Sequence, residues 1–162
     1  MGWLMENQAR PQNEYYPFEQ FAVDVEKIAK TVEASGRKFT KIWGPARGGL
    51  PLAVCLSHRL NLQLELTPPI NILAGISARL DSDKVGAFIQ QVTKDMLVVD
   101  DIADTGKVLG KYKAAGFFIA TLYYKRCCSF VPDIWLHEKK EAYIDFWWET
   151  MGKKIQCEQP LV

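Results

Sequence analysis

The chain has 162 residues and a mass of 18.4 kDa, the size of one domain that can bury a full core. Its 48% hydrophobic and 24% charged residues are close to globular averages. The net charge of +1 excludes a bulk field that attracts nucleic acid or an anionic membrane, and residues 117–124, the longest largely apolar run, are too short to span a bilayer.

The four cysteines indicate neither metal nor disulfide chemistry. Cys127 and Cys128 are adjacent, Cys55 and Cys157 stand apart, and no Cys-x-x-Cys pair or Cys/His cluster has zinc-ligand spacing. Residues 1–10 lack the apolar stretch of a secretory signal. We therefore expect reduced thiols in a cytoplasmic protein that contacts no membrane.

Hydrophobic spacing predicts alternating helices and strands. Residues 1–14 are polar and expected to be loose, whereas helical spacing from Phe18 predicts an amphipathic helix that ends near Ser35 and Gly36. The next expected elements are a strand at 41–43, a loop at 44–49, a helix at 50–60 that Asn61 stops, and a strand at 62–66.

The region after Pro68 and Pro69 is less regular. Two strands are expected at 70–76 and 86–92, around a polar, charged segment at 77–85. A buried strand at 96–100, a helix at 107–115 and a strand at 117–124 follow. This order predicts an α/β fold with a central, mostly parallel sheet flanked by helices.

Residues 96–107 carry the strongest chemical signal. An apolar strand ends in Asp100 and Asp101, and a short loop brings Asp-Thr-Gly (104–106) to the start of the next helix. Open α/β sheets bind ligands at this end of their strands. Free N–H groups at a helix start favour a phosphate, and neighbouring carboxylates suit ribose hydroxyls or hydrated magnesium. The stretch therefore predicts a site for a phosphorylated sugar.

A second motif, residues 42–50, leaves a strand, turns on glycines and enters a helix. Glycines allow the backbone to present several N–H groups to an anion, and Arg47 adds a guanidinium. Arg-Gly-Gly alone is a common turn. Its place one βαβ unit before the aspartate motif indicates a second anion contact.

Together the motifs resemble those of the type I phosphoribosyltransferases, which use 5-phosphoribosyl 1-pyrophosphate (PRPP) to turn a free base into a nucleotide. The resemblance implies the type I fold with a flexible loop, a small C-terminal hood and Mg²⁺ as cofactor. It implies a cis Ala46–Arg47 peptide, Asp104 as general base near the purine N7, and Asp101 at the metal. The implied PRPP contacts are Ala46, Arg47, Gly48, Asp100, Asp101, Thr105, Gly106 and Lys107.

The segment after the last strand resembles the base-binding hood of 6-oxopurine enzymes, most closely the short bacterial xanthine–guanine type. By that resemblance Lys125 donates to the 6-oxo group, Tyr143 stacks on the base, and the Ile144 backbone reads the 2-substituent. The alternative is a solvated lysine and aromatic residues in a core or dimer contact. We expect a homodimer or homotetramer, and divide the chain into a loose segment (1–14), a core (15–124) and a hood with tail (125–162).

Two positions depart from the family. Ala78 stands where many 6-oxopurine enzymes have tyrosine, and Val108 where the phosphate loop usually supplies threonine or serine. Both put catalytic efficiency in doubt more than fold. The expected reaction joins the phosphoribosyl group of PRPP to N9 of guanine, xanthine or hypoxanthine. The rivals are a transferase for adenine, uracil or orotate, a PRPP-sensing regulator, and a binding protein without turnover. No nucleic-acid partner is expected.

Overall fold

The computed structural model describes residues 13–71 and 82–150. Its main sheet has five strands in the order β3-β2-β4-β5-β6, and every neighbouring pair is parallel. This arrangement confirms the predicted α/β fold with a parallel sheet. The strands are β2 (Lys41–Trp43), β3 (Gln63–Leu64), β4 (Met96–Ala103), β5 (Phe118–Tyr124) and β6 (Ile134–Glu138).

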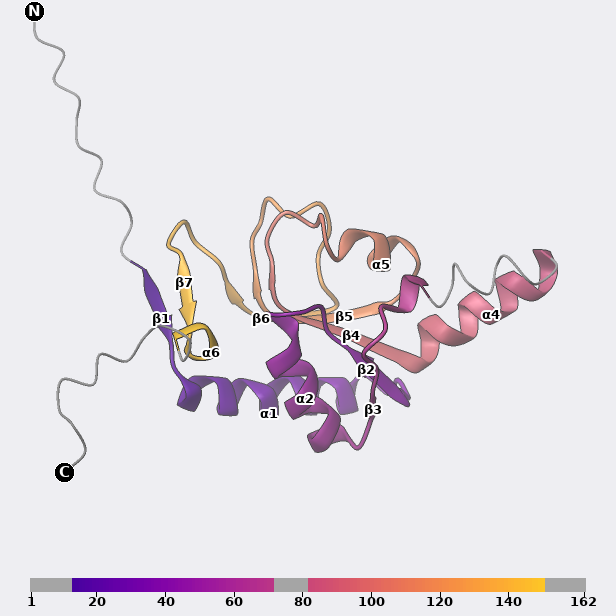
Figure 1. Ribbon diagram of the computed structural model, residues 1–162, viewed down its shortest axis with the longest axis horizontal. Coiled ribbons are helices and arrows are strands. Elements are labelled where there is room, and N and C mark those ends of the chain that lie inside the picture. The colour runs from indigo at the N-terminus through magenta and orange to yellow at the C-terminus, as the bar shows by residue number, and fades with distance from the viewer. Residues whose placement is uncertain (1–12, 72–81, 151–162) are drawn as a thin grey trace, which may run out of the picture.

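Helices lie on both faces of this sheet (Figure 1). On one face are α1 (Phe18–Ala34) and α2 (Gly49–Leu60), and on the other is the short α5 (Gly110–Ala114). Side chains of β4 alternate between the two cores: Leu97 and Val99 join the cluster with α1 and α2, while Val98 joins the cluster with α5. The period of two explains why β4 is apolar throughout its first half, since both of its faces are buried.

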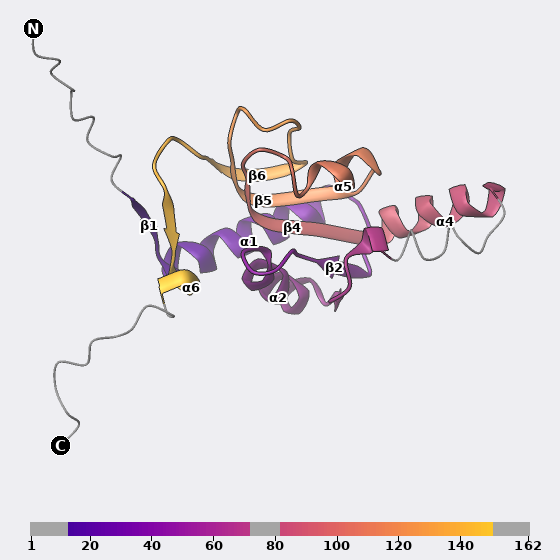
Figure 2. The same ribbon diagram turned by 45° about the horizontal axis from the view of Figure 1, so that its top comes forward.

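A second, two-stranded sheet lies at one end of the molecule, beside the start of α1 (Figures 1 and 2). It pairs β1 (Glu14–Tyr16) with β7 (Ile144–Phe146) in parallel, and α6 (Trp147–Thr150) follows at once. From here on, the term hood denotes β1, β7 and α6 only, a smaller unit than the range 125–162 expected from the sequence. β1 was not predicted, and it begins at Glu14, the last residue of the segment that we expected to be loose. Likewise β6 falls in the range that we assigned to the hood, yet it extends the main sheet.

One predicted strand, residues 86–92, is wrong: these residues belong to helix α4 (Ser82–Asp95). Phe88, Ile89 and Val92 pack against the core that contains Val98, and their spacing of one and three residues places them on one helical face. Gly86 and the two glutamines obscured that period. Of the segment 77–85, residues 77–81 lie outside the described residues, and 82–85 form the first turn of α4.

Other elements differ in their bounds. The helix expected at 107–115 is the shorter α5, because residues 107–109 form a turn that Gly110 N–H closes onto Gly106 O at 2.7 Å. The strand expected at 62–66 is confined to Gln63–Leu64. In the strand expected at 70–76, residues 70 and 71 are helical and the others lie outside the described residues. Among the described helices, none has the length and apolarity of a membrane span.

Candidate active site

β2 ends at Trp43, which lies opposite Val98 within β4, so the loop that follows β2 lies beside the next residues of β4. A Cβ added to Gly48 would overlap the Asp101 carboxylate, and one on Gly49 would lie 3.0 Å from Asp100 Oδ1. The Arg-Gly-Gly loop therefore needs glycine at both positions to pack against the aspartate pair. The structure thus brings together the two motifs that sequence analysis singled out separately.

The loop of residues 44–49 is held by its own backbone. Gly49 N–H donates to Pro45 O at 3.0 Å, Leu50 N–H donates to Arg47 O at 3.3 Å, and the Ala46–Arg47 peptide is cis, as the resemblance implied. Arg47 is exposed, and within residues 13–71 and 86–150 it has no carboxylate partner. Its guanidinium is therefore available to an anion at the edge of the sheet.

Asp100 and Asp101 lie in the last half of β4, inside the strand rather than after it. Asp101 N–H donates to Asp100 Oδ1 at 3.0 Å, and Ile102 N–H donates to Asp101 Oδ1 at 2.7 Å. Burial, with repulsion from Asp101, raises the pKa of the Asp100 carboxyl well above its usual value. Burial also raises the pKa of Asp101. A bound cation would offset the repulsion between these two buried carboxyls and stabilise their ionised forms.

Glu149 in α6 adds a third carboxylate near this pair, and its negative charge contributes to the raised pKa of Asp101. It comes from the hood, far along the chain from β4, so sequence analysis missed it. The only signal was an acidic residue directly after an aromatic run. The described residues contain no group of three side chains arranged to hold a metal on their own. Magnesium suits such a partial set, because it commonly keeps waters and phosphate oxygens as its other ligands.

The loop after β4 encloses a cavity of about 90 Å³, lined by Asp100 and residues 102–109. Lys107 N–H donates to the Thr105 hydroxyl at 3.3 Å. Gly106 has a φ of +84°, and a Cβ there would overlap the Ser129 hydroxyl, so only glycine fits this turn. A cavity this small suits a compact anion such as a phosphate. Val108 is 53% exposed at the rim of this cavity, and as a valine it offers no hydroxyl to a bound anion.

Lys125 directly follows β5, and its side chain reaches back toward the loop after β4. Lys125 Nζ lies 3.9 Å from Asp104 Oδ1 and 3.8 Å from Glu141 Oε2, and Lys125 N–H donates to Ala103 O at 3.0 Å. The Lys125 side chain is 25% exposed and the Asp104 side chain is 49% exposed. The structure therefore places the predicted base contact beside the predicted general base.

The remaining predicted base contacts are Tyr143, directly before β7, and Ile144, the first residue of β7. Tyr143 is 58% exposed, and its carbonyl accepts a hydrogen bond from Glu14 N–H at 2.8 Å. Ile144 is buried in β7 opposite Glu14. In the described residues no hydrogen bond or ring contact joins Tyr143 to Lys125, and Glu141 provides the link between Lys125 and the segment that enters the hood.

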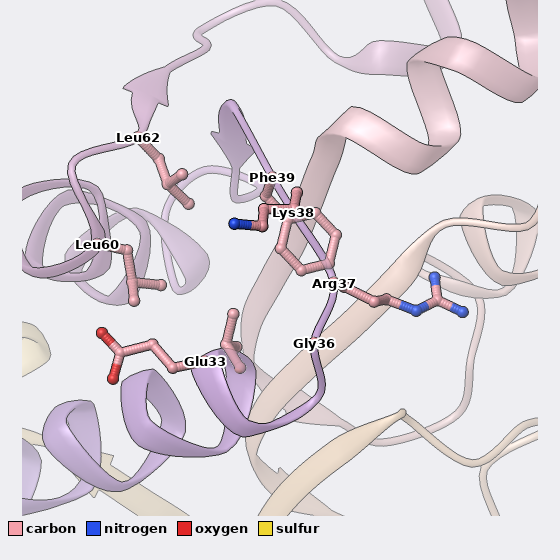
Figure 3. Close-up of a pocket in the computed structure, with 8 residues that line it drawn as sticks. Glu33, Gly36, Arg37, Lys38, Phe39, Leu60 and Leu62 are labelled. Carbon is pink, nitrogen blue, oxygen red and sulfur yellow. The ribbon is translucent and has the colours of Figure 1, made fainter.

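A separate cavity of about 410 Å³ lies at the opposite edge of the sheet, between the ends of α1 and α2 (Figure 3). Its lining includes Lys38, Phe39, Leu60 and Leu62, and Figure 3 shows the Arg37 side chain directed away from the leucines. Arg37 is instead placed 4.8 Å above the Phe118 ring. This cavity has none of the predicted site residues, and ligands of open α/β sheets bind at the other edge.

Several solved structures share this fold. A xanthine-guanine-hypoxanthine phosphoribosyltransferase from Helicobacter pylori matches with 23% identity and a TM-score of 0.65, over 87% of this chain and 95% of that one. A purine phosphoribosyltransferase from Pyrococcus horikoshii matches with 26% identity and a TM-score of 0.60, over 93% and 97%. A hypothetical protein from Neisseria gonorrhoeae with bound ppGpp matches with 15% identity and a TM-score of 0.60, over 89% and 93%.

The comparison with curated proteins found no match. The model of the phosphoribosyl transferase domain matches residues 11–150, which include the loop of residues 44–49, the loop after β4, Lys125 and the hood. The chain therefore belongs to the phosphoribosyl transferase domain family.

Proposed function

We propose that this protein transfers the 5-phosphoribosyl group from PRPP to N9 of a 6-oxopurine and releases pyrophosphate, as in purine salvage. The observation that carries the proposal is the position of the Lys125 ammonium, 3.9 Å from the Asp104 carboxylate and beside the cavity of the loop after β4. Two of the similar structures carry purine phosphoribosyltransferase names, which supports the same class of base.

The loop of residues 44–49 and the loop after β4 bind different parts of PRPP. The small cavity of residues 102–109 takes the 5′-phosphate, with Thr105, Gly106 and Lys107 as its contacts. Asp100 and Asp101 face the ribose hydroxyls, since carboxylates accept hydrogen bonds from hydroxyl groups. The segment of exposed Ala46 and Arg47 and half-buried Gly48 binds the pyrophosphate, where the guanidinium stabilises the charge of the leaving group.

Magnesium fits the aspartate pair as an oxygen-ligand cation, with Asp101 as the residue that would hold it. When bound, it would neutralise charge on PRPP and ease departure of pyrophosphate. The raised pKa values of Asp100 and Asp101 support this reading, because such crowded carboxyls stay ionised more readily beside a cation.

The transfer forms the N9–C1′ bond and breaks the bond from C1′ to the pyrophosphate oxygen. The purine gives up one proton, for which Asp104 is the general base. Lys125 donates to the 6-oxo group, an acceptor that the amino group of adenine does not match. The exposed Tyr143 ring offers a flat surface on which the base can stack.

The test is a base screen with the purified full chain. PRPP and MgCl₂ are combined with guanine, xanthine, hypoxanthine, adenine, orotate or uracil, and nucleotides are measured by chromatography. We expect a nucleotide from at least one 6-oxopurine, and none when metal is chelated. Product from orotate or adenine alone would assign another base. PRPP binding without product from any base would favour a regulator or an inactive binding protein.

A further inference from the structure

Asp24 is a carboxylate in an unusual place for a residue of its charge. It lies on the inner face of α1 beside Phe21, Val25 and Ile28, and its side chain is completely buried. An unpaired charge in such a place is costly, so its partners decide whether it can be tolerated. None of the roles assigned to the edge loops involves this residue.

The partners of Asp24 come from three parts of the fold. Tyr16 Oη in β1 donates to Asp24 Oδ2 at 2.9 Å, and His137 Nε2 in β6 contacts the same oxygen at 2.5 Å. Because a carboxylate only accepts, Nε2 carries the proton of that contact. Gln20 Nε2 and Lys27 Nζ, from α1 itself, each lie 3.0 Å from Asp24 Oδ1. One buried carboxylate thus joins α1, the outer strand of the main sheet and the first strand of the hood.

Tyr16 carries this connection into the hood. Its ring packs edge-on against Tyr123 of β5 at 5.7 Å and against Phe146 of β7 at 5.4 Å. In the β1–β7 pairing Tyr16 lies opposite Phe146, and Glu14 lies opposite Ile144. Since Glu14 N–H also binds Tyr143 O, the position of β1 sets the position of residues 143 and 144.

We propose that Asp24 and Tyr16 are positioning residues for base recognition, which fix the hood on the core so that Tyr143 and Ile144 face the purine held by Lys125. This inference rests on the proposed function, because it assigns the hood to the base. It predicts a selective defect. Loosening the hood weakens purine binding, while the PRPP contacts on β2 and β4 keep their places.

The test combines Tyr16→Phe with Asp24→Asn. Tyr16→Phe keeps the ring and its packing and removes only the hydroxyl that reaches Asp24, so it is the variant expected to fold. Loss of one hydrogen bond to a carboxylate should raise the KM for the purine by about tenfold, with kcat and the PRPP KM within about twofold of wild type. Asp24→Asn should raise the purine KM further. Ser57→Ala is the control, since it removes a buried hydroxyl bond within α2, away from the hood.

Hydrogen exchange supplies a readout that needs no activity. In Tyr16→Phe the amides of β1 and β7 should exchange at least about fivefold faster, while those of β4 and β5 stay unchanged. Unchanged exchange in the hood would overturn the proposal. So would faster exchange with an unchanged purine KM, or an equal rise in both KM values. If wild type makes no nucleotide from any 6-oxopurine, the proposed function fails, and the anchoring of the hood is judged by exchange alone.

Discussion

Lys125 Nζ lies 3.9 Å from Asp104 Oδ1, although the two residues follow different strands. The reason is the parallel pairing of β4 with β5, in which Ala103 lies opposite Tyr124, so the next residues of both strands leave the sheet together. This separation is longer than a hydrogen bond, so the ammonium and the half-exposed carboxylate can each bind a substrate atom. In the proposed function the cation reads the base and the carboxylate takes its proton.

Lys125→Ala tests the base-reading role. We expect the KM for the purine to rise roughly ten- to a hundredfold, because a hydrogen bond from a charged donor contributes about 1.5–3 kcal/mol. The KM for PRPP should barely change. Steady-state kinetics with each substrate varied in turn measures both. Lys140→Ala, at an exposed lysine of the same segment, is the matched control. An unchanged purine KM would return Lys125 to the role of a solvated residue at a strand end.

Asp104→Asn tests the general base. The amide keeps the shape of the side chain but takes up no proton, so kcat should fall by about a hundredfold or more. PRPP affinity, measured by calorimetry, should stay nearly intact. Asp101→Asn gives the contrasting result, because it should weaken PRPP binding in the presence of Mg²⁺. Full turnover by Asp104→Asn would place the base elsewhere or assign the proton to water.

Gly48→Ala tests the contact between the Arg-Gly-Gly loop and the aspartate pair. Gly48 has a helical φ of −61°, so alanine brings no backbone strain there, only a Cβ that overlaps the Asp101 carboxylate. Overpacking of this kind costs about 1–3 kcal/mol, which corresponds to a PRPP KM raised roughly five- to 150-fold. Gly86→Ala is the control, since its Cβ would meet nothing within 4 Å. Equal kinetics for both variants would contradict the tight packing of this loop.

Local signals were sufficient for the centre of the fold. The strand at 41–43 and the stop of α2 at Asn61, which adopts the left-handed conformation, follow from neighbouring residues alone. The two edge motifs also came from local spacing, and the order of the elements placed their loops together. The helix α4 was missed because its apolar period, seen in Phe88, Ile89 and Val92, was interpreted as part of a strand.

Long-range contacts explain the rest of the differences. β1 is a short segment that, among residues 13–71 and 82–150, pairs only with β7, near the end of that range, so no local pattern reveals it. Asp24 looks like a solvent-facing residue of an amphipathic helix. Its buried carboxylate accepts hydrogen bonds from Tyr16, which lies outside the helix in β1, and from His137, which is 113 residues away in sequence. Glu149 likewise reaches the aspartate pair only through the placement of the hood.

The buried Asp24 carboxylate leads to a prediction of how the stability of the protein responds to acid. Burial alone would raise the pKa of Asp24, but hydrogen bonds from His137, Lys27, Gln20 and Tyr16 outweigh it and lower the pKa below its usual value of 3.8. A group whose folded-state pKa is depressed stabilises the fold above its unfolded pKa, and this contribution is lost as the pH falls through the folded value.

Urea unfolding at pH 6 and at steps below pH 4 should therefore show wild type losing stability on acidification more steeply than Asp24→Asn, whose amide does not titrate. The variant should be the less stable protein at pH 6, and the difference should narrow toward pH 2. Parallel curves for the two proteins would show that the Asp24 network contributes nothing to acid sensitivity.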